Sequence, residues 1–210
     1  MTKHHLIISG TGRSGTTFLV QLLTALGLDT GFIDLYSDVE ENCNAGMEQD
    51  LRSPDAPYIV KTPWLCDYLD EALEGGDIVI DHAIIPMRDL YSAAQSRRDV
   101  MARTDASLYP EGIPGGLWHT DKPERQETVL THQLYKLMYA LARHDIPVTL
   151  IDFPRFIHDP EYLFRKLEFA LPGTRRDRFI EVFRLVVRPE LVHTYSPPPP
   201  LEMVSGQSEP

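Results

Sequence analysis

The sequence has little cysteine, no long apolar run and a shortage of positive charge. Its 210 residues include two cysteines, Cys43 and Cys66, which lack the spacing of a metal-binding or disulfide-rich motif. No run approaches the roughly 18 apolar residues that a membrane-spanning helix needs. The apolar stretch near the start is too short for a secretory signal. We therefore expect neither a disulfide scaffold nor an integral membrane protein, and we expect a cytoplasmic location.

Acidic side chains outnumber basic ones by 31 to 20, which gives a formal net charge of −11 at pH 7. The overall field of such a chain repels polyanions, so nucleic acid is not an expected partner. An anionic ligand would have to be bound by a local cluster of donors.

Short apolar runs alternate with segments of helical apolar spacing along the chain. The runs that are typical of buried strands lie at 5–9, 57–62, 82–87 and 147–153. Helices are expected between Gly15 and Gly27, at 64–73 and 88–103, around 130–141, and at 160–170 and 175–188. This alternation predicts an α/β fold in which helices cover both faces of a parallel sheet. Such sheets bind ligands beyond the carboxyl ends of their strands.

One domain over residues 1–195 accounts for these elements. Residues 104–123 are rich in glycine and proline, so we expect a loop or lid there. Residues 196–210 are proline-rich and without periodicity, which predicts a disordered tail. Trp64 and Trp118 are expected to pack in the core and the lid, although either could also stack on adenine or cover a sugar ring.

The segment between the first strand and the first helix reads GTGRSGTT (10–17). Gly10, Gly12 and Gly15 let the backbone approach a ligand closely. The N–H groups that follow lie at a helix N-terminus, where the helix dipole favours an anion. One cation and three hydroxyls add further donors: Arg13, Ser14, Thr16 and Thr17. We interpret the segment as a phosphate-binding loop.

The nucleotide-triphosphatase pattern G-x-x-x-x-G-K-[ST] fits this loop only in part. Gly10, Gly15 and Thr17 agree with the pattern, but Thr16 stands at the lysine position. Without that lysine the loop lacks the group that reaches the terminal phosphates of ATP. The cation stands at Arg13 instead, which favours a different phosphorylated donor.

GTGRSGTT resembles the 5′-phosphosulfate-binding loop of the sulfotransferase family, whose donor is 3′-phosphoadenosine 5′-phosphosulfate (PAPS). The resemblance implies a three-layer fold like that of the P-loop nucleotide hydrolases, with helices on both sides of a central parallel sheet. It also implies that Arg13 helps to neutralise the transferring group. The loop residues implied to bind the donor are Gly12, Arg13, Ser14, Gly15, Thr16 and Thr17.

A second motif of that family is an arginine at the end of the third strand and a serine eight residues later, which together hold the 3′-phosphate of the donor. This chain has PMRDLYSAAQS (86–96), with Arg88 and Ser96 at that separation. From the residues alone, Arg88 could instead pair with Asp89 or Asp99, and the serine could simply pack.

Two weaker matches, PYIVKTPWL (57–65) and residues 147–171, extend the resemblance over most of the chain from 5 to 171. The first of them implies that Lys61 lies near the transferring group. As a whole, the resemblance implies an enzyme of the bacterial branch that passes the sulfuryl group of PAPS to a hydroxyl or amine. The acceptor would be a small molecule or a carbohydrate, PAP would be released, and no metal is expected.

Such a transfer needs a general base to take the proton of the acceptor. The cytosolic branch of the family has a histidine where this chain has Pro63, and other branches use a glutamate after the first helix. Here the acidic stretch 34–51 contains Glu40, Glu41 and Glu48. We prefer Glu48, with Glu41 second. The later alternatives are His119 and His132.

Two other functions stay open at this point. A P-loop kinase would use Mg-ATP, with Thr17 and Asp152 near the metal, and a non-catalytic module would bind a nucleotide without a base. Arg88 and Ser96 favour the sulfotransferase because ATP has no 3′-phosphate. The sequence does not identify the acceptor or the oligomeric state, and an oligomer in which a partner subunit completes the acceptor site is compatible with the short chain.

Overall fold

The computed structural model describes residues 2–36, 38–40, 43–110 and 112–197. Four parallel strands form one sheet in the order β4-β1-β5-β6. Their bounds are Lys3–Ile8 for β1, Ile59–Lys61 for β4, Ile78–Arg88 for β5 and Val148–Phe153 for β6. The predicted α/β fold with a central parallel sheet is therefore confirmed.

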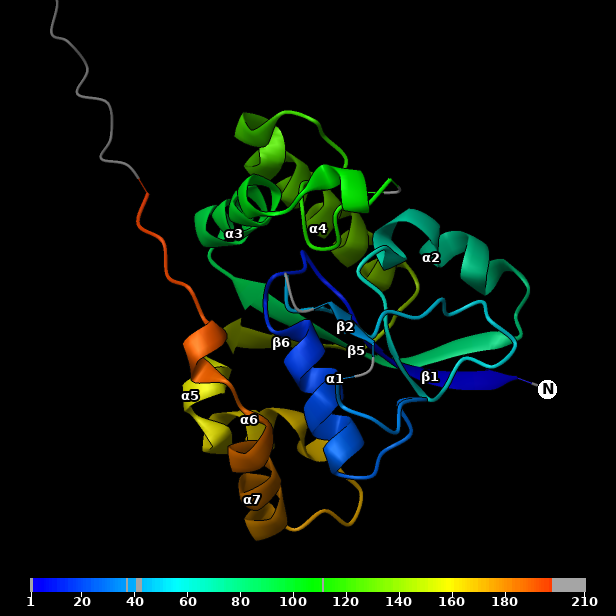
Figure 1. Ribbon diagram of the computed structural model, residues 1–210. Coiled ribbons are helices and arrows are strands. Elements are labelled where there is room, and N and C mark those ends of the chain that lie inside the picture. The colour runs from blue at the N-terminus through cyan, green and yellow to red at the C-terminus, as the bar shows by residue number, and fades with distance from the viewer. Residues whose placement is uncertain (1, 37, 41–42, 111, 198–210) are drawn as a thin grey trace, which may run out of the picture.

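Helices cover both faces of the sheet (Figure 1). On one side lie α1 (Thr16–Ala25), α5 (Arg155–His158), α6 (Pro160–Leu167), the short turn η3 (Glu168–Ala170) and α7 (Arg176–Val186). On the other side lie α2 (Leu65–Glu74), α3 (Leu90–Arg103) and α4 (Gln126–Arg143). Among the described residues, no helix combines the length and the apolarity that crossing a membrane requires.

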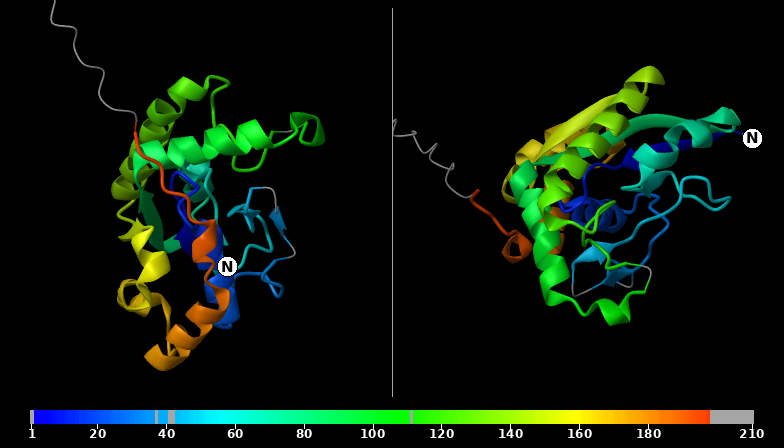
Figure 2. Two further views of the ribbon diagram at one scale, coloured as in Figure 1. Left: turned by 60° about the vertical axis from the view of Figure 1, so that its left-hand side comes forward. Right: turned by 90° about the horizontal axis from the view of Figure 1, so that it is seen from above.

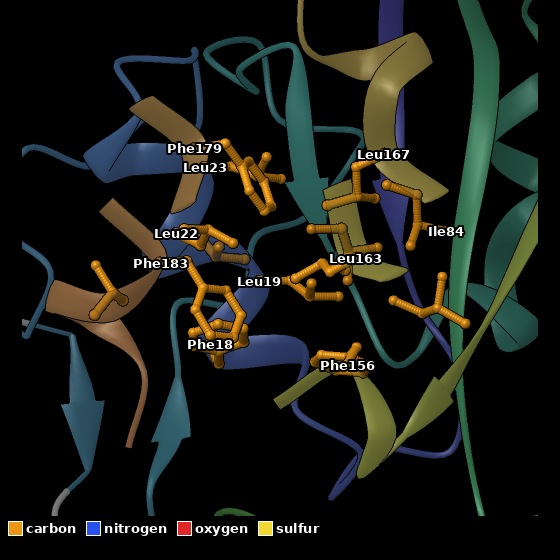
Figure 3. Packing of buried hydrophobic residues seen from close by; sticks show 14 of the residues in the cluster. Phe18, Leu19, Leu22, Leu23, Ile84, Phe156, Leu163, Leu167, Phe179 and Phe183 are labelled. Carbon is orange, nitrogen blue, oxygen red and sulfur yellow. The ribbon is translucent and has the colours of Figure 1, made fainter. Parts of the chain in front are cut away.

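The alternation of side chains along β1 divides the core between the two faces. Leu6 and Ile8 point towards α1, whereas Ile7 points towards α2 and α4, and all three are buried. Figure 3 shows how α1 packs against α6 and α7 through a continuous apolar layer. The layer includes Phe18, Leu19, Leu22, Leu23, Leu163, Leu167, Phe179 and Phe183. This packing holds α1 firmly, with its first turn beyond the end of β1.

Strand β5 begins earlier than the sequence pattern indicated. The predicted strand covered 82–87, but the observed strand begins at Ile78 and pairs there with the first residues of β1. Asp81 interrupts the apolar pattern, and its carboxylate lies 2.7 Å from His4 Nδ1 at the surface. Ile78, Val79 and Ile80 are apolar, but Asp81 and His82 separate them from the buried run that follows, so the sequence pattern did not join the two parts into one strand.

The acidic stretch after α1 contains a hairpin that the sequence did not predict. Strands β2 (Val39–Glu40) and β3 (Ala45–Gly46) pair antiparallel over two residues each. A strand of two residues is too short to produce a recognisable alternation. The hairpin places the residues that follow it next to the end of β4, since Gln49 N donates to Lys61 O at 2.9 Å.

The described residues between α3 and α4 include two short turns, η1 (Ala106–Leu108) and η2 (Pro123–Arg125). We call residues 112–119 of this connection the lid loop. After α7 the chain makes one more turn, η4 (Pro189–Leu191), and then runs beside the start of α3 (Figure 2). There Ser92 Oγ donates to Tyr195 O at 3.3 Å. Residues 198–210 of the predicted tail lie outside the described part of the chain.

Candidate functional site

A cavity of about 740 Å³ lies beyond the carboxyl ends of the central strands. Its volume falls within the roughly 300–1,000 Å³ that is usual for ligand-binding pockets. Segments far apart in the sequence form its walls: the glycine-rich loop, the first turn of α1, the ends of β4 and β5, the β2–β3 hairpin, the lid loop and the segment after α7. This is the place where parallel sheets commonly bind ligands.

Two glycines of the glycine-rich loop, Gly12 and Gly15, stand where a side chain would not fit. Gly12 and Gly15 have φ angles of 65° and 79°. A Cβ atom on Gly12 would lie 2.7 Å from Arg97 Nη2, and one on Gly15 would lie 2.7 Å from Phe156 Cζ. Arg13 also has a positive φ, 55°, which costs about 1–3 kcal/mol for a residue with a side chain and is typical of binding sites. Because the glycines have no side chain, the loop backbone itself borders the cavity at these positions.

Five of the six predicted loop residues line the cavity: Gly12, Arg13, Gly15, Thr16 and Thr17. Ser14 is the exception, because its side chain is fully buried and does not reach the cavity. In the part of the chain that the structure describes, its Oγ atom has no hydrogen-bond partner. The predicted hydroxyl contact of Ser14 is therefore not supported, and only its backbone amide is left for that role.

The first turn of α1 contains no acidic residue. The helix begins at Thr16, directly after the loop, so the positive end of its dipole lies at the cavity. Loop amides and helix dipole together favour an anion at this point.

Arg13 connects the two predicted phosphate motifs. Its Nε donates to Ser96 Oγ at 3.1 Å, and its Nη1 donates to the carbonyl of Cys43. Arg88 Nη1 donates to the Arg13 carbonyl at 2.6 Å, and Arg88 Nη2 donates to the carbonyl of His193. Arg88 and Ser96 both line the cavity. The structure therefore brings the two residues of the second motif together with the glycine-rich loop.

The nearby carboxylates do not neutralise Arg88. Asp89 Oδ1 caps α3 by accepting a hydrogen bond from Ser92 N at 2.8 Å, and Asp99 Oδ1 accepts one from Gln95 Nε2 at 2.8 Å. Burial, together with the neighbouring charge of Arg13, lowers the pKa of Arg88. Its guanidinium is held by backbone carbonyls and keeps a charge that a ligand can use.

Arg97 is a site residue that the sequence analysis missed. It is 6% exposed and lines the same cavity. Its Nη1 donates to Gly116 O at 2.7 Å and its Nη2 to Thr11 O at 2.6 Å, so it links the lid loop to the glycine-rich loop. The guanidinium also lies 5.3 Å from the Trp118 ring centroid. Burial, with a smaller effect of Arg13, lowers the pKa of Arg97 to about 9.

Helical periodicity contained a signal for Arg97. Ala93 and Val100 lie four residues before it and three after it, and both are buried. The neighbouring Arg98 falls on another face and pairs with Glu127 at 2.6 Å. Of the two neighbouring arginines, Arg97 lies on the apolar face of α3 and is buried, whereas Arg98 does not lie on that face.

The cavity carries an excess of positive charge in an acidic chain. Among the described residues, Arg13, Arg88 and Arg97 form no ion pair with a carboxylate. They donate instead to backbone carbonyls and to one serine hydroxyl. Unneutralised charge away from water is costly, and binding an anion relieves that cost.

Lys61 and Glu48 form an ion pair at the end of β4. Lys61 is 3% exposed, and its Nζ lies 2.8 Å from Glu48 Oε1 and 2.8 Å from Thr17 Oγ1. Burial lowers the pKa of Lys61, while the carboxylate of Glu48 acts in the opposite direction. Glu48 is partly exposed and lines the cavity. The structure thus brings the preferred base next to the residue implied to contact the transferring group.

Among the residues that the structure describes, the other predicted candidates for acid–base or metal chemistry do not line the cavity. Glu41 lies outside the described residues. His119 pairs with Asp67 at 3.0 Å and does not line the cavity. His132 is exposed on α4, and Asp152 is exposed at the end of β6. Neither of these two residues lines the cavity.

The two tryptophans differ in their surroundings. Trp118 is partly buried, packs against the core beside α2 and α4 and also lines the cavity. Trp64 is 48% exposed and lines the cavity, so its predicted place in the core is wrong. It follows β4 directly, where the chain leaves the sheet to begin α2.

Comparison with known proteins identifies no relative: no family model, no curated protein and no solved structure matches the chain. The geometry and charge of the cavity, together with the sequence motifs that form it, are therefore the basis for assigning a function.

Proposed function

We propose that the protein is a sulfotransferase that uses PAPS as its donor. The observation that carries the proposal is the convergence of Arg13, Arg88 and Arg97 on one cavity without carboxylate partners among the residues that the structure describes. A cation cluster of this kind is stabilised by a polyanionic ligand. PAPS carries negative charge at its 5′-phosphosulfate and at its 3′-phosphate. It can therefore pair with more than one of the three guanidinium groups.

The cavity offers two positions for anionic groups. The first is formed by the amides of the glycine-rich loop with the hydroxyls of Thr16 and Thr17. The second lies between Arg88, at the end of β5, and Ser96 in α3. Arg13 is part of the loop and contacts both residues of the second position, since its carbonyl accepts from Arg88 Nη1 and its Nε donates to Ser96 Oγ. By their resemblance to the family motifs, the first position would hold the 5′-phosphosulfate and the second the 3′-phosphate.

The proposal includes a finer fold class. A central strand, a glycine-rich turn and a buried helix open the parallel sheet, in the order β1, loop, α1. This arrangement supports a fold like that of the P-loop nucleotide hydrolases.

PAPS, when bound, would supply a sulfuryl group that passes from its 5′-phosphate to the acceptor oxygen or nitrogen and leaves PAP as product. Arg13, Lys61 and the loop amides would stabilise the negative charge spread over the transferred group. Glu48 borders the cavity beside Lys61 and would take the proton of the acceptor. The remaining contribution of the protein is to position its two substrates.

The kinase alternative is less well supported by the contacts of its two key residues. Thr17 Oγ1 accepts a hydrogen bond from Lys61, and Asp152 does not line the cavity. A kinase of this type would need both residues near the magnesium ion that ATP brings. The presence of Glu48 in the cavity likewise favours an enzyme over a non-catalytic binding module.

Arg88→Ala tests the second anion position. We expect it to weaken PAP binding about 10- to 100-fold, which is the range for losing a charged hydrogen bond. The affinity for 5′-AMP, which lacks the 3′-phosphate, should fall less than about threefold. For that nucleotide the variant loses only the screened, long-range attraction of one positive charge. Isothermal titration calorimetry with the two nucleotides measures this difference.

Arg103→Ala is the matched control for that variant. Arg103 is exposed in the last turn of the neighbouring helix α3 and does not line the cavity. Its removal takes away the same charge and should leave PAP affinity nearly unchanged. Equal losses of PAP and 5′-AMP affinity in Arg88→Ala would show that Arg88 does not contact a 3′-phosphate.

A further inference from the structure

The segment that follows η4 lies against the second anion position. We call residues 192–195 the strap, which runs beside the start of α3 (Figure 2). Val192 and His193 line the cavity. Val192 packs against the apolar layer that contains α1 and α7, whereas His193 and Thr194 are exposed. Beyond Val192 the strap is therefore held in place by individual contacts rather than by burial in the core.

The strap contacts Arg88, one of the two residues of that position. The carbonyl of His193 accepts a hydrogen bond from Arg88 Nη2, and the Tyr195 ring centroid lies 5.9 Å from Arg88 Cζ. The other terminal nitrogen, Nη1, donates to Arg13 O at 2.6 Å. Both terminal nitrogens of this guanidinium thus donate to a backbone carbonyl, one from the strap and one from the glycine-rich loop.

The two carbonyls differ in how firmly they are held. Arg13 belongs to the glycine-rich loop, which joins β1 directly to α1 and accepts a further hydrogen bond from the buried Arg97. His193 is exposed, and the next contact along the strap is the 3.3 Å hydrogen bond from Ser92 Oγ to Tyr195 O. An exposed segment held by neutral hydrogen bonds opens at low cost. The strap can therefore leave Arg88, whereas the loop carbonyl stays in place.

A phosphate is a stronger partner for Arg88 than the carbonyl of His193. The guanidinium is partly buried, so its charge is costly unless acceptors surround it. A carbonyl oxygen carries only a partial negative charge. A phosphate carries full negative charge and forms a bidentate ion pair with a guanidinium. Two acceptor oxygens repel each other at the same N–H group, so a phosphate that binds there replaces the carbonyl of the strap.

We propose that the strap is an autoinhibitory element of the donor site, in which the His193 carbonyl and the 3′-phosphate of the donor compete for Arg88. This inference rests on the proposed function, which supplies the 3′-phosphate. Donor binding opens the strap, and the affinity for the donor is reduced in proportion to the fraction of molecules whose strap is closed. A nucleotide without a 3′-phosphate does not use Arg88 and leaves the strap in place.

Ser92→Ala tests the competition through binding. The substitution removes the hydrogen bond to Tyr195 O and keeps the cap of α3, because Asp89 accepts from the backbone N–H of Ser92. A looser strap competes less well, so we expect PAP affinity to rise about 2- to 10-fold, the range for one neutral hydrogen bond, with 5′-AMP affinity unchanged. Calorimetry on the full chain measures both. Thr194→Ala is the matched control: it shortens an exposed side chain of the same strap and should change neither affinity.

Spin labels test the opening itself. Both native cysteines are buried, so nitroxides can be attached to new, exposed cysteines. One label is placed on the strap with Thr194→Cys and the other on the exposed face of α7 with Arg184→Cys. Double electron–electron resonance measures the distances between them. We expect saturating PAP to shift or broaden this distribution and saturating 5′-AMP to leave it unchanged. A control pair on two helices, Arg184→Cys with His132→Cys, should respond to neither nucleotide.

The outcomes separate this proposal from the proposed function. If PAP binds but its affinity in Ser92→Ala is unchanged or lower, or rises equally with that of 5′-AMP, the strap does not compete with a 3′-phosphate and the proposal is overturned while the donor site stands. The same holds if PAP leaves the distances to the strap label unchanged or narrows their distribution, since a narrower one would mean that the strap closes on the donor. If PAP does not bind the unaltered protein, the proposed function fails and this proposal fails with it.

Discussion

Glu48→Gln is expected to reduce kcat for sulfuryl transfer by about 10²- to 10⁴-fold, the range for loss of a general base. The amide oxygen of glutamine can still accept the hydrogen bond that Lys61 Nζ now donates to Glu48 Oε1 at 2.8 Å. The position of Lys61 should therefore be kept, and PAP affinity should change less than about threefold. Steady-state kinetics with labelled PAPS and calorimetry with PAP measure the two quantities separately.

Asp50→Asn is the matched control, because Asp50 lies two residues further along and is exposed. Its carboxylate pairs with Arg52 at 2.8 Å, away from the cavity. This variant should keep full turnover. Full turnover in Glu48→Gln would remove Glu48 as the base, and a parallel loss of PAP affinity would assign it a role in holding Lys61.

Arg97→Ala is expected to weaken PAP binding by about 100-fold or more, in the range found when one partner of a buried charged contact is removed. The substitution removes one of the three unpaired cations. It also leaves the carbonyls of Thr11 and Gly116 without the donors that now lie 2.6 and 2.7 Å away. Because these carbonyls belong to the glycine-rich loop and the lid loop, both segments should become more mobile. Calorimetry with PAP and amide hydrogen exchange over residues 112–119 test the two effects.

Arg98→Ala provides the comparison on the same helix. Arg98 carries the same charge but pairs with Glu127 and does not line the cavity. It should leave both PAP affinity and exchange in the lid loop unchanged. Similar behaviour of the two variants would mean that Arg97 acts only through the net charge of α3.

The architecture was largely predictable because its elements carry strong local patterns. The β-branched run that became β1, the glycine-rich turn and the apolar periodicity of α1 agree with one another, and each lies where it was expected. The carboxyl ends of parallel strands then place residues from β4 and β5 at one edge of the sheet. The resemblance to the sulfotransferase motifs implied that Lys61 and Arg88 lie near the donor, and both residues line the cavity.

What could not be predicted depends on contacts between distant segments. The Arg13 side chain donates to Ser96 and to the carbonyl of Cys43. No local sequence pattern predicts either contact, because the partners are distant in the sequence. The same holds for the segment after α7, where the carbonyl of His193 accepts from Arg88. Sequence periodicity gives the face of a helix, but it does not give the partner that a distant loop provides.

Trp64 illustrates a different limit. Large aromatic residues bury much apolar surface, so a place in the core is the usual expectation for a tryptophan after a strand. Here the chain turns into α2 at the next residue, Leu65, which is fully buried while Trp64 is left at the cavity. Which of two adjacent apolar residues faces the core is decided by the exact turn, and the sequence does not specify that turn.

The most direct test of the donor site is a calorimetric comparison of PAP, 5′-AMP and Mg-ATP on the unaltered protein. With one anion position in the glycine-rich loop and a second between Arg88 and Ser96, PAP should bind at least about 10-fold more tightly than either other nucleotide. Mg-ATP binding as tightly as PAP, or PAP binding no more tightly than 5′-AMP, would contradict the assignment.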